Sequence, residues 1–192
     1  MKKRNIGFCI TGSFCTFAEI LEQLKTLTQK YNITPIVSEH SVNIDTRFGA
    51  GANFLDALSD ICQNKPIQTI VSAEPIGPQS LFDALVIAPI TGNTLGKLAN
   101  GITDNTVSMA AKAHLRNEKP VILGISTNDG LLSNAENIGK LLGRKYYYFV
   151  PFGQDDPLKK PYSLVADYSQ IGDTIEAALG FKQLQPLLLR RV

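Results

Sequence analysis

Short apolar runs alternate along the chain with segments whose apolar residues recur every three or four positions. The runs lack the polar alternation of a half-exposed strand, which predicts strands covered on both faces. These predicted strands lie at residues 5–11, 33–38, 68–73, 83–89, 119–126 and 146–152.

The intervening segments carry the period of a helix, as in Leu21 and Leu24. Ser133 and Glu136 fit an S-x-x-E capping box at the start of one helix, and Gly143 would cap its end. The predicted helices lie at residues 13–31, 51–64, 93–100, 104–117, 134–143 and 169–180.

This alternation predicts a three-layer α/β/α fold, an open and mostly parallel sheet with helices on both faces, Rossmann-like or flavodoxin-like. No repeat or linker divides the chain, so residues 1–192 are expected to form a single domain. The polar, proline-bearing residues 154–163 predict a loop. The long polar segment 39–51 is either a functional loop or a mobile one.

Composition narrows the class of partner. Hydrophobic residues make up 44% of the chain and charged residues 19%, with a net charge of +2. This ordinary balance argues against nucleic-acid and membrane partners. The basic clusters at 2–4 and 190–191 are expected to be solvated ends.

The first residues superficially mimic a secretory signal, with a basic head before an apolar run. Thr11-Gly12-Ser13 splits that run, Glu19 follows soon after, and no apolar stretch approaches the roughly 20 residues that span a bilayer. Three cysteines without a CxxC pair fit a reducing compartment, and two distant histidines argue against structural zinc. We therefore expect a cytoplasmic protein.

Three turns follow strands, where ligands of an open parallel sheet bind. At Gly12-Ser13, backbone N–H groups at a helix start favour a phosphate, although Ser13 could simply cap an ordinary tight turn. The turn has one glycine, so the dinucleotide pattern GxGxxG is absent and an NAD site is poorly supported. The second turn begins at Ser38.

The third turn, residues 88–94, reads "APITGNT" and leaves a buried strand with hydroxyls, an amide and a glycine in succession. Thr91, Asn93 and Thr94 lie in it, and Asp104 and Asn105 follow at the next helix start. Hydroxyl and amide groups bind neutral heterocycles and phosphates without ionised side chains. The turn therefore predicts a site for a small polar ligand.

"APITGNTLGKLANGITDN" is similar to "PASANT" and "AKIANGIADN" of the family of homo-oligomeric, FMN-containing cysteine decarboxylases. "TGSFCTFAEIL" resembles that family's first phosphate turn, and "LGISTN" (123–128) takes the place of its "PAMN" segment. The resemblance spans roughly residues 5–145 and implies a flavoprotein fold that binds FMN. The residues it implies for FMN are Gly12, Ser13, Phe14, Ser38, Pro89, Thr91, Asn93, Thr94, Asp104, Asn105 and Asn128.

One departure from that family concerns its catalytic histidine, whose position falls at Pro75 here. Proline cannot transfer a proton, which argues against cysteine decarboxylation. His40 could replace the base, but an exposed loop histidine is the favoured interpretation. The catalytic residues are therefore left unassigned.

Further markers, "SAEPIGP" and "YYYFVPFGQDDPxxKPxSL", resemble one branch of the family. That branch supplies one subunit of an oxidoreductase that forms an aromatic dicarboxylate from a lysine-pathway intermediate in the mother cell during sporulation. It implies a partner subunit carrying NAD(P), a small dicarboxylate substrate and a homo-oligomer. The alternatives are a scaffold without catalytic activity and a stand-alone FMN-dependent decarboxylase-like enzyme.

Other candidates have simpler explanations. Cys15 could be reactive at a helix start, but packing is favoured. Residues 155–156 could form an acid or metal pair, but the following proline favours a turn. Arg47, Lys159 and Lys160 could bind a dicarboxylate, although solvated loop charge is favoured.

Overall fold

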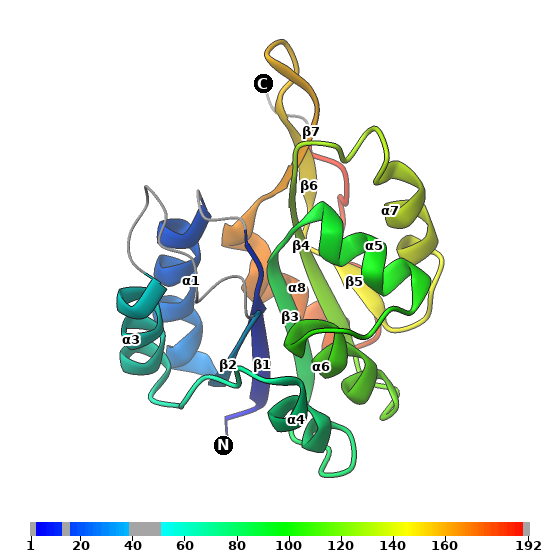
Figure 1. Cartoon of the computed structure of the whole chain (residues 1–192). Coiled ribbons are helices and arrows are strands. Elements are labelled where there is room, and N and C mark those ends of the chain that lie inside the picture. Colours follow the sequence, from blue (N-terminus) through cyan, green and yellow to red (C-terminus); the bar gives the residue numbers. More distant parts are fainter. Residues whose placement is uncertain (1–2, 13–15, 39–50, 190–192) are drawn as a thin grey trace.

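A central sheet organises the computed structural model, which describes residues 3–12, 16–38 and 51–189 (Figure 1). The strand order is β2-β1-β3-β4-β7-β6, and β5 also pairs with β4. The mostly parallel sheet with helices on both faces is confirmed. Its strands are β1 (Asn5–Ile10), β2 (Asn32–Val37), β3 (Ala84–Ile90), β4 (Val121–Thr127), β5 (Tyr147–Phe149), β6 (Phe152–Asp156) and β7 (Lys160–Ala166).

β4 is the strand at which the parallel and antiparallel parts of the sheet meet. Strands β2, β1, β3, β4 and β5 run parallel, and β3 is buried along its whole length. β5 pairs with residues 121–123 of β4, whereas antiparallel β7 pairs only with Ser126 and Thr127. The β6–β7 hairpin therefore continues beyond the carboxyl ends of the parallel strands, as Figure 1 shows.

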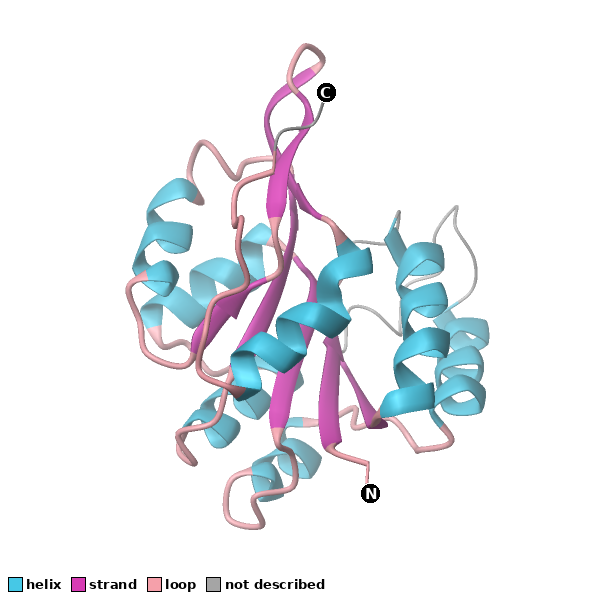
Figure 2. Ribbon diagram, turned by 180° about the vertical axis from the view of Figure 1, so that it is seen from behind, coloured by secondary structure: helices cyan, strands magenta, loops and turns pink. Residues whose placement is uncertain are grey.

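Helices cover both faces of the sheet. α6 packs on β2, β3 and β4 and lies in front in Figure 1, whereas α8 packs on β3 and β4 and lies in front in Figure 2. Within the described ranges, no helix is long and apolar enough to cross a membrane. The helices are α1 (Phe17–Lys30), α3 (Gly51–Cys62), α4 (Ile70–Ala73), α5 (Gly92–Asn100), α6 (Thr106–Leu115), α7 (Ala135–Leu142) and α8 (Ile171–Leu179), with 3-10 turns η2 (Glu74–Ile76) and η3 (Tyr168–Gln170).

The prediction of a strand at residues 68–73 is wrong. Thr69 and Ser72 form a capping box, in which each side chain accepts the other residue's backbone N–H, and the short helix α4 begins between them. Val71 is 77% exposed. The β-branched residues predicted a buried strand, but local hydrogen bonds of the hydroxyl side chains fix a helical turn.

The predicted loop at residues 154–163 is also wrong, because most of it belongs to the β6–β7 hairpin. Asp156 accepts the backbone N–H groups of Leu158 and Lys159, which closes the turn. The predicted strand at 146–152 is divided into β5 and the start of β6. Pro151 lies in the break and has no N–H for a ladder.

The side of β2 that faces away from β1 is contacted by the segment after α3. The Val37 N–H donates to the Ile67 carbonyl (2.9 Å), and the Ile67 N–H donates to the Pro35 carbonyl (2.9 Å). One residue of an otherwise irregular connection thus fills two of the hydrogen-bonding positions that a further strand would use.

The edges of β5 and β6 are occupied by the chain after α8. The side-chain amide of Gln183 both accepts the Phe149 N–H (2.8 Å) and donates to the Phe149 carbonyl (2.7 Å). Phe152 donates its N–H to the Leu187 carbonyl (3.0 Å) and accepts the Leu189 N–H (2.9 Å). These contacts hold the final segment against the sheet.

Candidate functional site

Polar residues follow four neighbouring parallel strands at the carboxyl ends of those strands. Thr11, Ser38, Thr91 and Asn128 come directly after β1, β2, β3 and β4, and the Ser38 N–H donates to the Ile10 carbonyl (3.3 Å). Because parallel strands end at a common edge, the sequence prediction of a shared site is consistent with this placement. This group of strand ends is the candidate site.

Thr11 fastens the end of β1 to the end of β3. Its hydroxyl donates to the Pro89 carbonyl (2.8 Å) and accepts the Thr91 N–H (3.1 Å). Thr11 is buried, and the Ala88–Pro89 peptide is cis. Sequence analysis missed Thr11, although its position between an apolar strand and Gly12 was the available signal.

The N-terminus of α5 opens directly from this junction. Thr91 is its N-cap, but its side chain makes no capping bond and instead pairs with the Thr94 hydroxyl (3.3 Å). The first N–H groups of a helix have no partner within the helix, and the helix dipole makes this end electropositive. Asn93 is exposed and Thr94 is buried beside these groups.

The end of β4 carries a hydrogen-bond network centred on Asp129. Its carboxylate accepts from the Thr127 hydroxyl (2.5 Å), the Ser133 hydroxyl (2.7 Å) and the Asn134 side-chain amide (2.9 Å to each oxygen). These donors, the Thr127 hydroxyl first, lower the pKa of Asp129 against the opposing effect of burial. At neutral pH the carboxylate is thus a fixed negative charge and a poor proton acceptor.

The same network shows why the predicted capping box of α7 is wrong. Ser133 uses its hydroxyl to reach Asp129, the N-cap is Asn134 without a side-chain capping bond, and Glu136 pairs with Lys140 (2.7 Å). The predicted C-cap at Gly143 is confirmed.

Gly92 allows α5 to approach the Asp129 network. A Cβ atom at Gly92 would lie 2.4 Å from Asn134 Nδ2, and 2.8 Å from both Asp129 Oδ1 and Thr127 Oγ1. The glycine of "APITGNT" is therefore needed for close packing at this position. The contact brings the ends of β3 and β4 together as one polar surface.

Asp104 and Asn105 lie apart from this group, beyond the other end of α5. Asp104 accepts both 2.9 Å hydrogen bonds from Lys97 Nζ, and Asn105 caps α6 through Ser108. Both residues therefore stabilise helix ends within this chain.

Three sequence candidates of this region, Ser13, Phe14 and His40, lie outside the described residues, as do Cys15 and Arg47. Gly12 is the last described residue before that gap and is partly buried.

Pro75 and the hairpin charges lie elsewhere. Pro75 lies in η2, in the connection that leads into β3. This connection ends where the parallel strands begin, since the Asp83 N–H donates to the carbonyl of Asn5, the first residue of β1 (2.7 Å). In the hairpin, Lys160 pairs with Asp155 (2.7 Å). The acidic pair at residues 155–156 ends β6 and makes its contacts within the hairpin, and the turn follows at residues 157–159.

Among the described residues, the candidate site offers groups suited to hydrogen bonding. Its donors and acceptors are the Thr91 and Thr94 hydroxyls, the Asn93 amide and the backbone N–H groups of α5. Such groups suit the nitrogen- and oxygen-bearing edge of a neutral heterocycle, or a phosphate at the electropositive helix end.

Comparison with known proteins adds a family to this geometry. Residues 1–156 match the Flavoprotein family. The chain is 46% identical over 190 residues to the B-type subunit of dipicolinate synthase from Bacillus subtilis (strain 168), covering 98% of this chain and 95% of that protein.

Solved structures agree with that comparison. The crystal structure of the B-type dipicolinate synthase subunit from Bacillus halodurans C superposes with a TM-score of 0.90 at 45% identity, covering 98% of this chain and 97% of the other. The FMN-dependent cysteine decarboxylase SpaF superposes with a TM-score of 0.63 at 18% identity, covering 93% and 95%. The latter likeness concerns the fold.

Proposed function

Because this chain belongs to the Flavoprotein family, we propose that it acts as the B-type subunit of a dipicolinate synthase. The observation that carries the proposal is the 46% identity to a protein of that name over 98% of the chain, together with the TM-score of 0.90 to a second one. The enzyme is an oxidoreductase, and this chain contributes a ligand site at the strand ends.

The proposed cofactor is FMN, bound at the candidate site. Thr91, Asn93 and Thr94 would hold the ring edge, and Gly12 with Ser13 would approach the phosphate, while Ser38, Pro89 and Asn128 would border the ring. Phe14 stays a further candidate from the family resemblance; Asp104 and Asn105, which the resemblance also implies, lie at the other end of α5. When bound, FMN supplies two-electron redox chemistry.

The proposed reaction forms pyridine-2,6-dicarboxylate from 4-hydroxytetrahydrodipicolinate. It removes one water molecule, two electrons and two protons from the substrate. The proposed partner is the A-type dipicolinate synthase subunit, whose NAD(P)⁺ accepts the two electrons with one proton as hydride, while the other proton is released. We propose that this takes place in the mother-cell cytoplasm, with this chain as a homo-oligomer.

A visible absorbance spectrum of the purified chain, with and without added FMN, tests the cofactor. We expect a bound-flavin spectrum that is lost in Asn93→Ala, because the Asn93 amide would no longer bind the ring. Asn100→Ala, at the far end of the same helix, is the matched control. An absence of binding at high FMN would refute the flavin site.

Reconstitution with the NAD(P)-carrying partner tests the role of this chain. We expect pyridine-2,6-dicarboxylate from the two proteins together and none from either of them separately. Product from the partner without this chain would show that this chain takes no part in catalysis. Product from this chain without the partner would indicate a stand-alone enzyme. Loss of product in Asn93→Ala, with the complex of the two proteins intact by gel filtration, separates a catalytic site from a scaffold.

A further inference from the structure

A hollow lies at the opposite end of α5 from the candidate site. It has a volume of about 430 Å³ and lies between the end of α5, α6 and the start of β5. This volume is in the range of small-molecule sites. Its apolar lining includes Leu98, Ile102, Leu115 and Tyr147.

Three cations line this hollow. Lys112 lies on α6 and Arg116 is the C-cap of that helix, a spacing of four residues that puts both side chains on the same side, and Arg144 lines the hollow from the segment before β5. In the described part of the chain, neither Lys112 nor Arg116 has an ion-pair or hydrogen-bond partner for its side chain. Like charges at this spacing repel each other, so an anion between them would relieve the repulsion.

Arg144 is held in place by the end of α5. Its guanidinium donates to the Leu98 carbonyl (3.1 Å) and the Ala99 carbonyl (2.8 Å). The Leu98 carbonyl also accepts the Gly101 N–H (3.3 Å), so Arg144 adds a second donor there and supplies one to the Ala99 carbonyl at the helix end. The Arg144 bonds also fix one positive charge at the wall, so less side-chain freedom is lost when an anion binds.

We propose that this hollow binds a small organic dianion. Arg116 and Lys112 would hold its negative groups, as charge-assisted hydrogen bonds, and the carbon body would lie on the apolar lining. More than one negative charge is needed, because Lys112, Arg116 and Arg144 all face the same space. Dicarboxylates and phosphate monoesters both meet this description.

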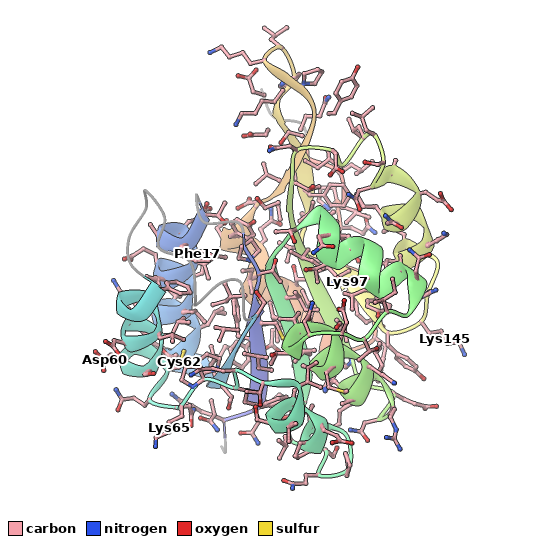
Figure 3. All side chains as sticks on the ribbon, in the orientation of Figure 1. Phe17, Asp60, Cys62, Lys65, Lys97 and Lys145 are labelled. Atoms are coloured by element: carbon pink, nitrogen blue, oxygen red, sulfur yellow. The ribbon has the colours of Figure 1, made fainter. Side chains whose placement is uncertain are left out.

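The proposed dianion site is separate from the flavin site. The nine residues of α5 lie between them, a rise of about 12 Å from its first to its last residue. Figure 3 shows Lys97 on α5 and Lys145, the neighbour of Arg144, on the same side of the molecule, whereas Lys65 lies on the other side near α3. The inference therefore does not rest on the proposed function.

Isothermal titration calorimetry on the full chain tests the dianion site. The probes are pyridine-2,6-dicarboxylate and phenyl phosphate, with benzoate and pyridine-2,6-dicarboxamide as singly charged and neutral comparisons. We expect at least one dianion to bind, and both comparison compounds to bind more weakly. The stronger of the two dianions identifies the head group for which the site is built.

The variant Lys112→Gln/Arg116→Gln should weaken dianion binding by roughly tenfold or more, the loss expected for two charge-assisted contacts. Lys65→Gln/Lys182→Gln removes the same charge from elsewhere and should leave the affinity unchanged. As a second variant, Ile102→Glu puts a carboxylate at the half-exposed lining and should also abolish binding. Circular dichroism checks that each variant folds.

The proposal is overturned if neither dianion binds, or if both charge-deleted double variants lose affinity equally. It is also overturned if Lys112→Gln/Arg116→Gln binds as the parent chain does, or if Asn93→Ala removes the binding, which would place the dianion at the strand ends. Retained dianion binding without FMN binding would refute only the flavin site.

Discussion

Thr11 and Thr91, eighty positions apart in sequence, are joined by a hydrogen bond from the Thr91 N–H to Thr11 Oγ1 (3.1 Å). The same hydroxyl donates to Pro89. The Thr11 side chain therefore links the ends of β1 and β3 beside its own backbone N–H, which donates to the same Pro89 carbonyl (3.3 Å), and the candidate ligand would lie at these ends.

Thr11→Val removes this hydroxyl while keeping the shape of the side chain. The Thr91 N–H loses its acceptor, whereas the Pro89 carbonyl keeps the Thr11 backbone N–H as a donor (3.3 Å). We expect the free energy of unfolding to fall by about 1–3 kcal/mol and FMN affinity to fall with it. Urea denaturation and flavin titration measure the two effects. Thr11→Ser retains the hydroxyl and is the control; an equal loss in both variants would contradict the role of the hydrogen bond.

Gly92→Ala should destabilise the chain, because its Cβ atom would lie 2.4 Å from Asn134 Nδ2 and would disturb the Asp129 network. We expect a loss of about 1–3 kcal/mol in urea denaturation. Gly96→Ala in the same helix meets its nearest atom at 3.5 Å and should be neutral or stabilising by up to about 1 kcal/mol. A stabilised Gly92→Ala variant would show that the approach of α5 to Asp129 is not tight.

Asp129 should make stability depend on pH in strong acid. Its pKa in the folded chain is lowered from the ordinary value of 3.8 by the Thr127, Ser133 and Asn134 donors. Its contribution is therefore fully present above that value and is lost as the pH falls below it. Asp129→Asn should remove this part of the acid dependence, measured as urea midpoints between pH 2 and pH 5. Asp60→Asn, on the exposed side of α3, is the comparison.

His114 should act in a different pH window. It is fully buried, its Nε2–H donates to the Pro120 carbonyl (3.2 Å), and among the described residues its Nδ1 has no partner. Burial lowers the pKa of His114 from 6.5 to about 4. Above pH 6.5 the ring is neutral in both the folded and the unfolded chain. As the pH falls from 6.5 to 4, the unfolded chain takes up the proton first, and the free energy of unfolding falls by about 3 kcal/mol. Below pH 4 this loss stops growing.

His114→Gln keeps a donor for Pro120 and has no titrating ring. We expect its stability to fall by much less than that of the parent chain between pH 6.5 and 4, in urea denaturation at a series of pH values. A variant that keeps the full acid dependence in this window would show that another group is responsible.

The fold was predictable where long elements carry a clear period. Strands that are covered on both faces read as continuous apolar runs, as β1, β3 and β4 do. A helix that covers the sheet carries apolar residues every three or four positions, as α1 does. The prediction of a strand at residues 68–73 was wrong because Thr69 and Ser72 form a capping box, which fixes a helical turn there. The hairpin was hidden because its polar, proline-bearing sequence resembles a loop.

The candidate site was predictable as a set of strand ends but not as a network. Thr91, Asn93 and Thr94 were identified from their residue types. Thr11 and Asp129 were missed, because their roles arise from partners far away in sequence or on a following turn. Asp104 seemed adjacent in sequence to the turn, yet the length of α5 moves it to the helix's other end.

The occupied edges of the sheet limit how copies of this chain can associate. Ile67 hydrogen-bonds to the edge of β2, and the Gln183 side-chain amide takes the place of a neighbouring strand beside Phe149 of β5. Leu187 and Leu189 hydrogen-bond to Phe152 at the start of β6. Another molecule therefore finds few open ladder positions there from which to continue the β-structure. Association of copies would then use side-chain surfaces of helices or the hairpin, and the same protection lowers the tendency to form amyloid-like aggregates.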